Sequence, residues 1–296
     1  MDVHQHLWPP PFVEALRRRR RPPRLVGWTL ELSGEPNYEV SPEDHDIARR
    51  TALASHDGLN LALVSLSSPL GIECLPPDEA APLLEAYHEG SLSLPRPFAT
   101  WAAACLSEID PGPLESALAR GCVGLQLPAT ALLDAAGYQR CRPLLEVLEG
   151  RGRPLLVHPG PAPAADGAPG WWAALVPYVQ QMHQAWFAFR THGRPRHPSL
   201  RVCFAILAGL AHLHGERCAA RGGGRGFIDP DVFVETSSYG PRAIDATVRV
   251  LGIDVVVHGS DRPYAPPTPP GLGEAAAHAL LTTNPLRLLE GKGGTP

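Results

Sequence analysis

Four side chains that commonly bind metal ions stand at three widely separated places in this sequence. His4 and His6 lie two residues apart near the amino terminus. His158 closes an apolar run, and Asp261 follows a Gly-Ser pair. Three imidazoles and one carboxylate suit Zn²⁺ or a similar divalent ion, with Mn²⁺ as the alternative. Such an ion can lower the pKa of a bound water from 15.7 to about 7, so the residue types predict metal-assisted chemistry near neutral pH.

The elements that must position these side chains are short apolar runs separated by helical patterns. Eight such runs occur, at residues 3–7, 61–66, 98–104, 121–127, 154–158, 201–207, 232–236 and 255–258. Near-continuous apolar strands are typical of a parallel sheet buried on both faces, and eight strand–helix units close into a barrel. The sequence therefore predicts the α/β class and a single-domain (β/α)8 TIM barrel over residues 1–296. The metal-binding residues would then meet at the carboxyl ends of the first, fifth and eighth strands.

Two segments depart from this rhythm. Residues 8–45 are rich in Pro and Arg, which predicts a long loop with a short helix near 12–20. A further helix is expected from about 41 to 56, with Ser41 as its cap. Residues 161–198 form an insertion between the fifth and sixth strands, with a Pro/Ala/Gly loop and then an aromatic helical run. We expect a crossover helix with an aromatic core face, a lid or substrate wall over the mouth, or the contact of a homodimer.

Composition sets limits on partners and location. The formal net charge of the 296-residue chain is −4, which favours neither nucleic acid nor an anionic membrane surface as a partner. No apolar stretch approaches the ~20 residues of a membrane span, and no secretory leader is evident. The six cysteines form no Cys-x-x-Cys pair. We therefore expect reduced thiols in a cytoplasmic protein that acts on a small molecule.

Several motifs resemble the amidohydrolase superfamily, within it the group that includes aminocarboxymuconate semialdehyde decarboxylase and related hydrolases. They are Asp-Val-His-Gln-His at 2–6, Leu-Val-His-Pro-Gly at 156–160, Glu-Thr-Ser-Ser-Tyr-Gly at 235–240, His-Gly-Ser-Asp-Arg-Pro-Tyr at 258–264 and Thr-Asn-Pro-Leu-Arg-Leu-Leu at 283–289. The resemblance spans nearly the whole chain. It implies a metal-dependent barrel with His4, His6, His158 and Asp261 as ligands, and it leaves the substrate open.

The chain departs from that superfamily at the end of the sixth strand. A histidine usually stands there, whereas this chain has Ile206. Isoleucine can neither bind a metal nor move a proton. We expect His212 to take over this role, and the alternative is that His212 and His214 both lie on the exposed start of the next helix.

Four more residues are candidates for contact with substrate. Gln126 ends the fourth strand and, being neutral, cannot bridge two metals, which favours a one-metal site. Arg262 could bind a substrate carboxylate or form an internal salt bridge. Tyr239 and Trp8 could form walls of the pocket or pack in the core.

These observations support three functions. The first is a metal-dependent hydrolase acting on a C–N or C–O bond of a small molecule, with Asp261 accepting and returning a proton. The alternative is a nonoxidative metal-dependent decarboxylase, a lyase of a small carboxylic acid. The third is a noncatalytic barrel that retains its metal site, an interpretation that Ile206 keeps open.

Overall fold

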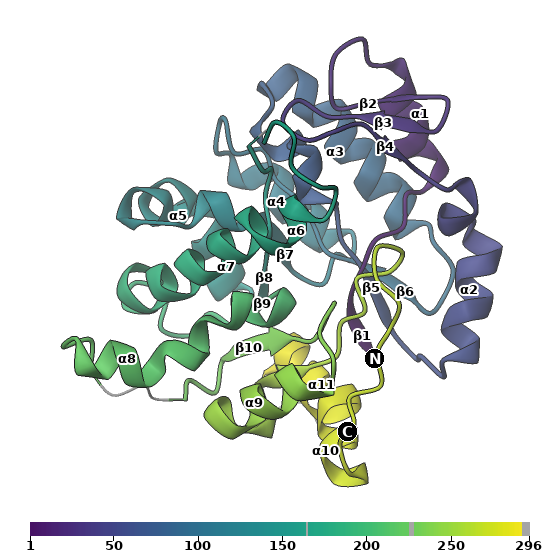
Figure 1. Ribbon diagram of the computed structural model, residues 1–296. Helices are drawn as coiled ribbons and strands as arrows, with labels where there is room; N and C mark the ends of the chain where they lie inside the picture. The colour runs from purple at the N-terminus through teal and green to yellow at the C-terminus, as the bar shows by residue number, and fades with distance from the viewer. Residues whose placement is uncertain (164, 225–227, 292–296) are drawn as a thin grey trace.

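The computed structural model describes residues 1–163, 165–224 and 228–291, and its centre is a ring of eight short parallel strands (Figure 1). The strands are β1 (Asp2–Gln5), β5 (Ala62–Val64), β6 (Phe98–Thr100), β7 (Leu125–Pro128), β8 (Leu155–His158), β9 (Val202–Phe204), β10 (Val232–Glu235) and β11 (Val256–Val257). Six of them fall within the predicted apolar runs, whereas β1 begins one residue before its run and β7 ends one residue after its run.

Hydrogen bonds close these strands into a barrel. Strands β1, β5 and β6 pair in parallel, as do β7 to β11 in sequence order. Single bridges from Ala102 to Leu125 and from Gln5 to Arg262 join the two sheets. The amide of Val3 also donates to the carbonyl of His258 at 2.9 Å. The predicted (β/α)8 barrel is therefore confirmed.

Apolar side chains fill the interior below the site. Every residue of β8 and β10 is buried, as continuous apolar strands require. One cluster joins Trp101 to Leu156 and Phe233 from different strands. The indole of Trp101 donates to the Val3 carbonyl at 2.9 Å, so its polar atom is satisfied inside the core.

Helices surround the barrel. The α-helices are α1 (Pro10–Arg18), α2 (Ile47–His56), α3 (Pro77–Leu92), α4 (Pro111–Ala119), α5 (Ala135–Gly150), α6 (Trp172–Leu175), α7 (Pro177–Ala188), α8 (Gly215–Ala220), α9 (Pro241–Leu251), α10 (Glu274–His278) and α11 (Asn284–Glu290). Shorter helical turns are η1 (Pro42–His45), η2 (Ser68–Leu70), η3 (Ile72–Cys74), η4 (Ala129–Ala131), η5 (Phe189–Gly193), η6 (Ile206–His214), η7 (Ile253–Val255) and η8 (Ala279–Thr283).

The segment before α2 differs from the prediction in two ways. The short helix is present as α1, but a small antiparallel sheet replaces the expected long loop, with strands β2 (Arg24–Val26), β3 (Thr29–Glu31) and β4 (Tyr38–Glu39). A tight turn at Gly27 (φ 62°) joins β2 to β3. An ion pair between Arg24 and Glu31, with two hydrogen bonds, stabilises this small sheet. The α2 helix begins at Ile47, because Asp46 rather than Ser41 accepts an amide hydrogen bond from its first turn.

The insertion forms a crossover helix with an aromatic core face. Trp186 of α7 and Phe189 both pack against Phe204 of β9, with ring centroids 5.4 and 6.1 Å apart. Trp171 and Trp172 remain exposed near α6. A homodimer contact through this segment stays a prediction.

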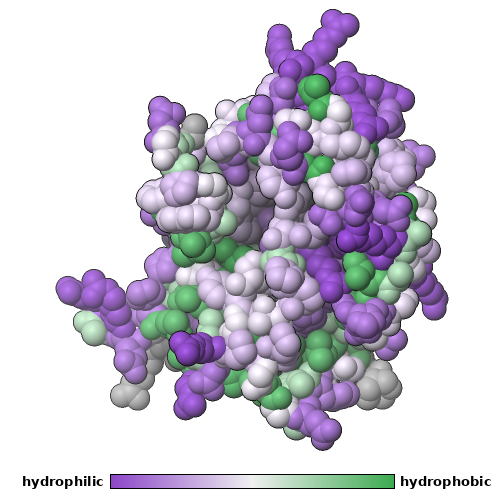
Figure 2. Space-filling model, turned by 45° about the vertical axis from the view of Figure 1, so that its right-hand side comes forward, coloured by the Kyte–Doolittle hydropathy of each residue, from purple (hydrophilic) through white to green (hydrophobic). Residues whose placement is uncertain are grey.

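The surface of the protein is largely polar. Figure 2 shows a mostly hydrophilic face on which apolar side chains form small separate groups. Among the described residues, no helix combines the length and apolar character that a membrane crossing requires. All six cysteines are free.

The hydroxyl group of Tyr87 connects two neighbouring strands of the barrel. It lies 3.1 Å from the Val64 carbonyl and 2.9 Å from the Trp101 carbonyl, so it links the ends of β5 and β6. Tyr87→Phe leaves the Trp101 carbonyl without a donor, whereas the Val64 carbonyl keeps the Trp101 amide at 2.9 Å. The variant should lower the free energy of unfolding by about 1–3 kcal/mol. Urea unfolding measures this change. Tyr38→Phe, at an exposed position, is the matched control and should change stability by less than about 0.5 kcal/mol; equal midpoints for both variants would contradict the assignment.

Candidate active site

The structure brings the four predicted metal-binding residues together at the carboxyl ends of the strands. One ligand atom from each of His4, His6, His158 and Asp261 lies within 4.8 Å of all the others. The Nε2 atoms of His4 and His6 are 3.1 Å apart. Oδ1 of Asp261 is 3.2 Å from Nε2 of His6 and 3.6 Å from Nε2 of His4. Residues separated by more than 250 positions therefore share one small volume.

The outer nitrogen of each imidazole is held by a hydrogen-bond acceptor. Nδ1 of His4 lies 3.2 Å from Oε1 of Glu235. Nδ1 of His6 lies 3.0 Å from the Ser65 carbonyl, and Nδ1 of His158 lies 2.8 Å from the Pro159 carbonyl. A carbonyl or carboxylate oxygen only accepts, so each Nδ1 carries a proton, and each ring presents an Nε2 lone pair to the cluster when its Nε2 is unprotonated.

This donor set fits a single divalent cation. When all three Nε2 atoms are unprotonated, three lone pairs and one carboxylate oxygen converge, and they repel one another unless a positive charge lies between them. Four ligands at 2.0–2.1 Å from a tetrahedral ion are about 3.3 Å apart. The separations among the ligand atoms of His4, His6 and Asp261, at 3.1, 3.2 and 3.6 Å, lie close to that spacing. Nitrogen and oxygen donors suit both Zn²⁺ and Mn²⁺, so the geometry leaves the choice of ion open.

The backbone at Asp261 adopts a strained conformation that directs its carboxylate to the histidines. Asp261 has a φ of 58°, a left-handed conformation that is unfavourable for a residue with a side chain. Its amide donates to the His4 carbonyl at 2.9 Å, and its carbonyl accepts from the amide of Tyr264 at 2.9 Å. Burial alone would raise the pKa of Asp261, but the hydrogen bond from His6 and the other imidazoles outweigh it, and the pKa is lowered. The carboxylate is thus kept ionised beside the histidines.

Glu235 was not among the site residues predicted from the sequence. It ends β10 with no exposed surface and accepts from His4, from the amide of Ile206 at 2.6 Å and from the amide and hydroxyl of Ser237 at 2.7 and 2.5 Å. Burial would lower the pKa of His4, but the Glu235 carboxylate outweighs it and raises that pKa to about 9. A carboxylate behind a ligand histidine fixes its ring and makes it a stronger donor. The available signal was an acid that ends an otherwise apolar strand.

Gly259 gives this carboxylate its space. A Cβ at position 259 would lie 2.1 Å from Oε2 of Glu235 and 3.1 Å from Cβ of His4. Real atoms do not approach so closely, so the glycine of the Gly-Ser-Asp turn is required by the site and not by the turn alone.

The first acid of the sequence supports the backbone of β1. Oδ1 of Asp2 accepts from the amides of His4 and Ser260, each at 3.1 Å. Its Oδ2 accepts from the Gln5 amide at 2.7 Å, and Gln5 in turn accepts from Arg50 at 2.6 Å. Asp2 and its partners therefore tie β1 to the loop that carries Asp261.

The structure does not bring His212 to the cluster. Ile206 occupies the expected position, but the chain then follows a left-handed turn through residue 210, with φ between 45° and 59°. This turn carries His212 behind the strands, where Nε2 lies 3.0 Å from the Thr247 hydroxyl of α9. His212 is 4% exposed, so the alternative of an exposed helix start fits His214 only.

Three of the candidate substrate contacts have structural partners instead. Arg262 forms an ion pair with Asp57 at 2.7 Å, which is the internal salt bridge weighed above. The Gln126 amide is fully buried and donates to the Leu66 carbonyl at 2.7 Å. Trp8 is 3% exposed and belongs to the core. These contacts hold loops in place, and a role for the three side chains in binding substrate stays a prediction.

Tyrosines line the approach to the cluster. The ring of Tyr264 lies 5.3 Å from the ring of His6 and is 42% exposed. The ring of Tyr38 lies 6.3 Å from Tyr264 and is also exposed. Tyr239 is half-buried, and Glu235 acts on it electrostatically. A role for Tyr239 in binding substrate stays a prediction.

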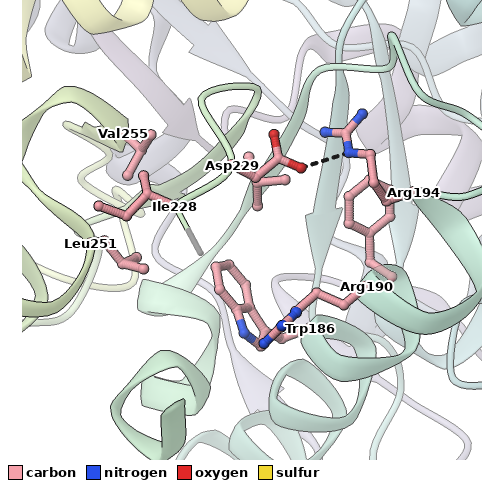
Figure 3. Close-up of a pocket in the computed structure, with 9 residues that line it drawn as sticks. Trp186, Arg190, Arg194, Ile228, Asp229, Leu251 and Val255 are labelled. Carbon is pink, nitrogen blue, oxygen red and sulfur yellow. Dashed lines mark hydrogen bonds and ion pairs between the residues drawn. The ribbon is translucent and has the colours of Figure 1, made fainter. Parts of the chain in front are cut away.

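A separate cavity contains none of the cluster residues. Figure 3 shows it between the end of α7 and α9, with Trp186 and Leu251 among its walls and an Arg194–Asp229 ion pair of 2.7 Å at its edge. It lies toward the amino ends of the strands, since Val232 and Val255 line it. Barrel enzymes carry their chemistry at the opposite end, so we assign this cavity no part in the reaction.

Comparisons with known proteins support the fold. No family model matches the chain, and no curated protein does. Among solved structures, 5-carboxyvanillate decarboxylase LigW from Sphingomonas paucimobilis is 18% identical, with a TM-score of 0.74 over 98% of each chain. The 2,6-dihydroxybenzoate decarboxylase from Rhizobium is 16% identical, with a TM-score of 0.67 over 99% of this chain and 100% of that chain.

A third solved structure contains a metal. The 5-carboxyvanillate decarboxylase of Novosphingobium aromaticivorans, complexed with manganese and 4-hydroxy-3-methoxy-5-nitrobenzoic acid, is 20% identical. It covers 74% of this chain and 71% of its own, with a TM-score of 0.60. At these identities the likeness shows a shared barrel fold, the one that the superfamily motifs implied.

Metal content tests the cluster directly. The protein supplied with Zn²⁺ or Mn²⁺ and then dialysed should hold about one ion per chain by elemental analysis. His4→Ala and Asp261→Asn each remove one donor and should lower the occupancy severalfold. Asp57→Asn removes a partly exposed acid outside the cluster and is the matched control. A wild-type protein that retains no metal would overturn the assignment.

Glu235 is tested by affinity rather than occupancy. Glu235→Gln places an amide N–H group among four donors and loosens the His4 ring, so the metal dissociation constant should rise about 10–100-fold. Competition with a chelator measures it. Glu73→Gln changes another fully buried acid, which bonds Ser68 and no ligand histidine, and should leave the affinity unchanged. Equal metal affinities in the two variants would show that Glu235 does not support metal binding.

Proposed function

We propose that this protein is a metal-dependent nonoxidative decarboxylase of a small aromatic carboxylic acid. The observation that carries the proposal is the convergence of three imidazole nitrogens and one carboxylate with the spacing of a bound divalent ion. The exposed ring of Tyr264 beside His6 adds an aromatic surface next to that position. Together they suit a planar substrate with an anionic group near the ion.

The comparisons favour decarboxylation over hydrolysis. Two solved structures that align over nearly the whole chain are named as decarboxylases of 5-carboxyvanillate and of 2,6-dihydroxybenzoate. A third, which aligns over 74% of the chain, contains manganese with a nitrobenzoic acid. Hydrolysis was the leading interpretation of the sequence alone. The fold neighbours give the lyase alternative the stronger support.

The residues of this chain would have distinct roles in such a reaction. A divalent ion held by the three histidines and Asp261 would supply positive charge that stabilises an oxyanion on the substrate. Glu235 fixes the orientation of the His4 ring, and the Ser65 and Pro159 carbonyls fix the orientations of the His6 and His158 rings. Tyr264 offers a face on which an aromatic ring can stack. Burial of the histidines keeps water from the inner side of the cluster.

Hydrolysis of a C–N or C–O bond is the second candidate. The same donor set occurs in metal-assisted hydrolysis, and Asp261 stands beside His6, where a carboxylate could accept a proton. A noncatalytic barrel would retain the metal without turnover of either kind.

Product analysis separates these candidates. The Mn²⁺- or Zn²⁺-loaded protein should release CO₂ from benzoic acids that carry a hydroxyl next to the carboxyl group, with the phenol formed in equal amount. Chelation should abolish release, and Asp261→Asn should lower it by at least about 100-fold. Benzoate without a hydroxyl is the control and should not react. Cleavage of amides or lactones without CO₂ release would favour the hydrolase, and metal binding without either reaction would favour the noncatalytic barrel.

A further inference from the structure

Two further histidines lie side by side outside the ring of strands. His183 belongs to α7 and His214 ends η6, and their ring centroids are 5.1 Å apart with an interplanar angle of 78°. Both line an open groove between α7 and η6 that contains none of the four cluster residues. The proposed decarboxylation gives neither histidine a role, so their proximity calls for a separate explanation.

The rings of this outer pair are arranged like those of the metal cluster. The three histidine pairs of the cluster have centroid separations of 4.8, 4.9 and 5.2 Å and interplanar angles of 84° or 85°. The outer pair, at 5.1 Å and 78°, is close to each of them. In the cluster, this arrangement leaves the Nε2 atoms of His4 and His6 3.1 Å apart, near the spacing of two ligands on one ion. The outer pair therefore has a ring geometry that suits two ligands of a single metal ion.

Close packing of η6 against α7 fixes the backbone on both sides of the pair. A Cβ at Gly209 would lie 2.6 Å from the Val179 carbonyl oxygen and 3.3 Å from the amide nitrogen of His183, so a glycine is needed for this approach. One turn further along α7, the ring of Trp186 lies 6.0 Å from that of His212. These contacts hold the two segments before any ligand arrives, which reduces the ordering that binding would otherwise require.

Both imidazoles are available to a ligand. Within the part of the chain that the structure describes, neither side chain makes a hydrogen bond or an ion pair. Burial and the neighbouring His214 lower the pKa of His183, so near neutral pH its ring is uncharged and carries a free lone pair. His214 is exposed, so its ring can turn to meet an ion beside the half-buried ring of His183.

We propose that His183 and His214 form a second metal site, which holds one divalent ion of the kind that imidazole prefers, such as Zn²⁺ or Ni²⁺. Water from the open groove would fill the remaining coordination positions. With two protein ligands, the site binds its ion more weakly than the four-ligand cluster and fills only at higher metal concentration. The inference does not depend on the proposed decarboxylase function.

An ion at this site would join α7 to the far end of η6. The same segment begins at Ile206, whose amide donates to Oε1 of Glu235 at 2.6 Å, and Glu235 in turn orients the His4 ring. The ion would therefore restrain the segment that supports one ligand of the cluster. Because such an ion binds the folded chain at a preformed pair, it should also stabilise the fold.

Calorimetry with Ni²⁺ as the probe tests the site in the Zn²⁺-loaded full chain. The wild type should bind about one Ni²⁺ per chain, and elemental analysis afterwards should still find about one zinc. His183→Ala and His214→Ala each leave a single imidazole, so the Kd for Ni²⁺ should rise at least about tenfold. His214 is exposed, so its variant serves even if His183→Ala folds poorly. His192→Ala removes another histidine of the same groove and is the matched control.

Thermal unfolding gives a second readout. Added Ni²⁺ should raise the Tm of the wild type and of His192→Ala by at least about 2 °C and should leave the Tm of the other two variants nearly unchanged. A Zn²⁺-loaded wild type that binds no Ni²⁺ would overturn the proposal, as would equal affinities in the wild type, His183→Ala and His214→Ala. Zinc released in step with Ni²⁺ uptake would show exchange at the cluster and would also overturn it, and so would loss of binding in His192→Ala.

Discussion

The mutual repulsion of four electron-rich atoms is the constraint on which the site depends. The Nε2 atoms of His4 and His6 lie 3.1 Å apart, and Oδ1 of Asp261 lies 3.2 Å from Nε2 of His6. The Nδ1 atoms of both rings face hydrogen-bond acceptors, which keep a proton on each Nδ1. When neither a proton nor a cation lies between them, this arrangement is unfavourable, and the fold must hold it by other means. Parallel strands do so by bringing their carboxyl ends to one rim of the barrel.

A layer of buried polar groups behind the ligands supplies the remaining precision. Asp2 joins the His4 amide to the Ser260 amide, and Glu235 joins the His4 ring to the end of β9 through the Ile206 amide. Each of these carboxylates meets several donors, as buried charges must. The ligands are consequently oriented before any ion arrives, which reduces the ordering that binding would otherwise require.

The sequence was sufficient for the parts of the structure that follow from local pattern. Eight apolar runs became eight strands, and ligands at strand ends met because parallel strands align their ends. Glu235 could not be found in this way, since its importance arises from its contact with His4, 231 positions away in the chain. His212 was misplaced because spacing alone does not reveal a left-handed turn at four residues with side chains. The small sheet was missed because β2 to β4 have only two or three residues each.

The left-handed turn also explains how the end of β9 serves the site without a histidine. Residues 206–210 adopt a conformation that costs about 1–2 kcal/mol for each non-glycine residue, so the surrounding structure must hold it in place. What the turn provides is the Ile206 amide, which donates to Oε1 of Glu235 at 2.6 Å and thereby steadies the His4 ring. Position 206 thus contributes a backbone donor to ligand orientation and no side chain to proton transfer.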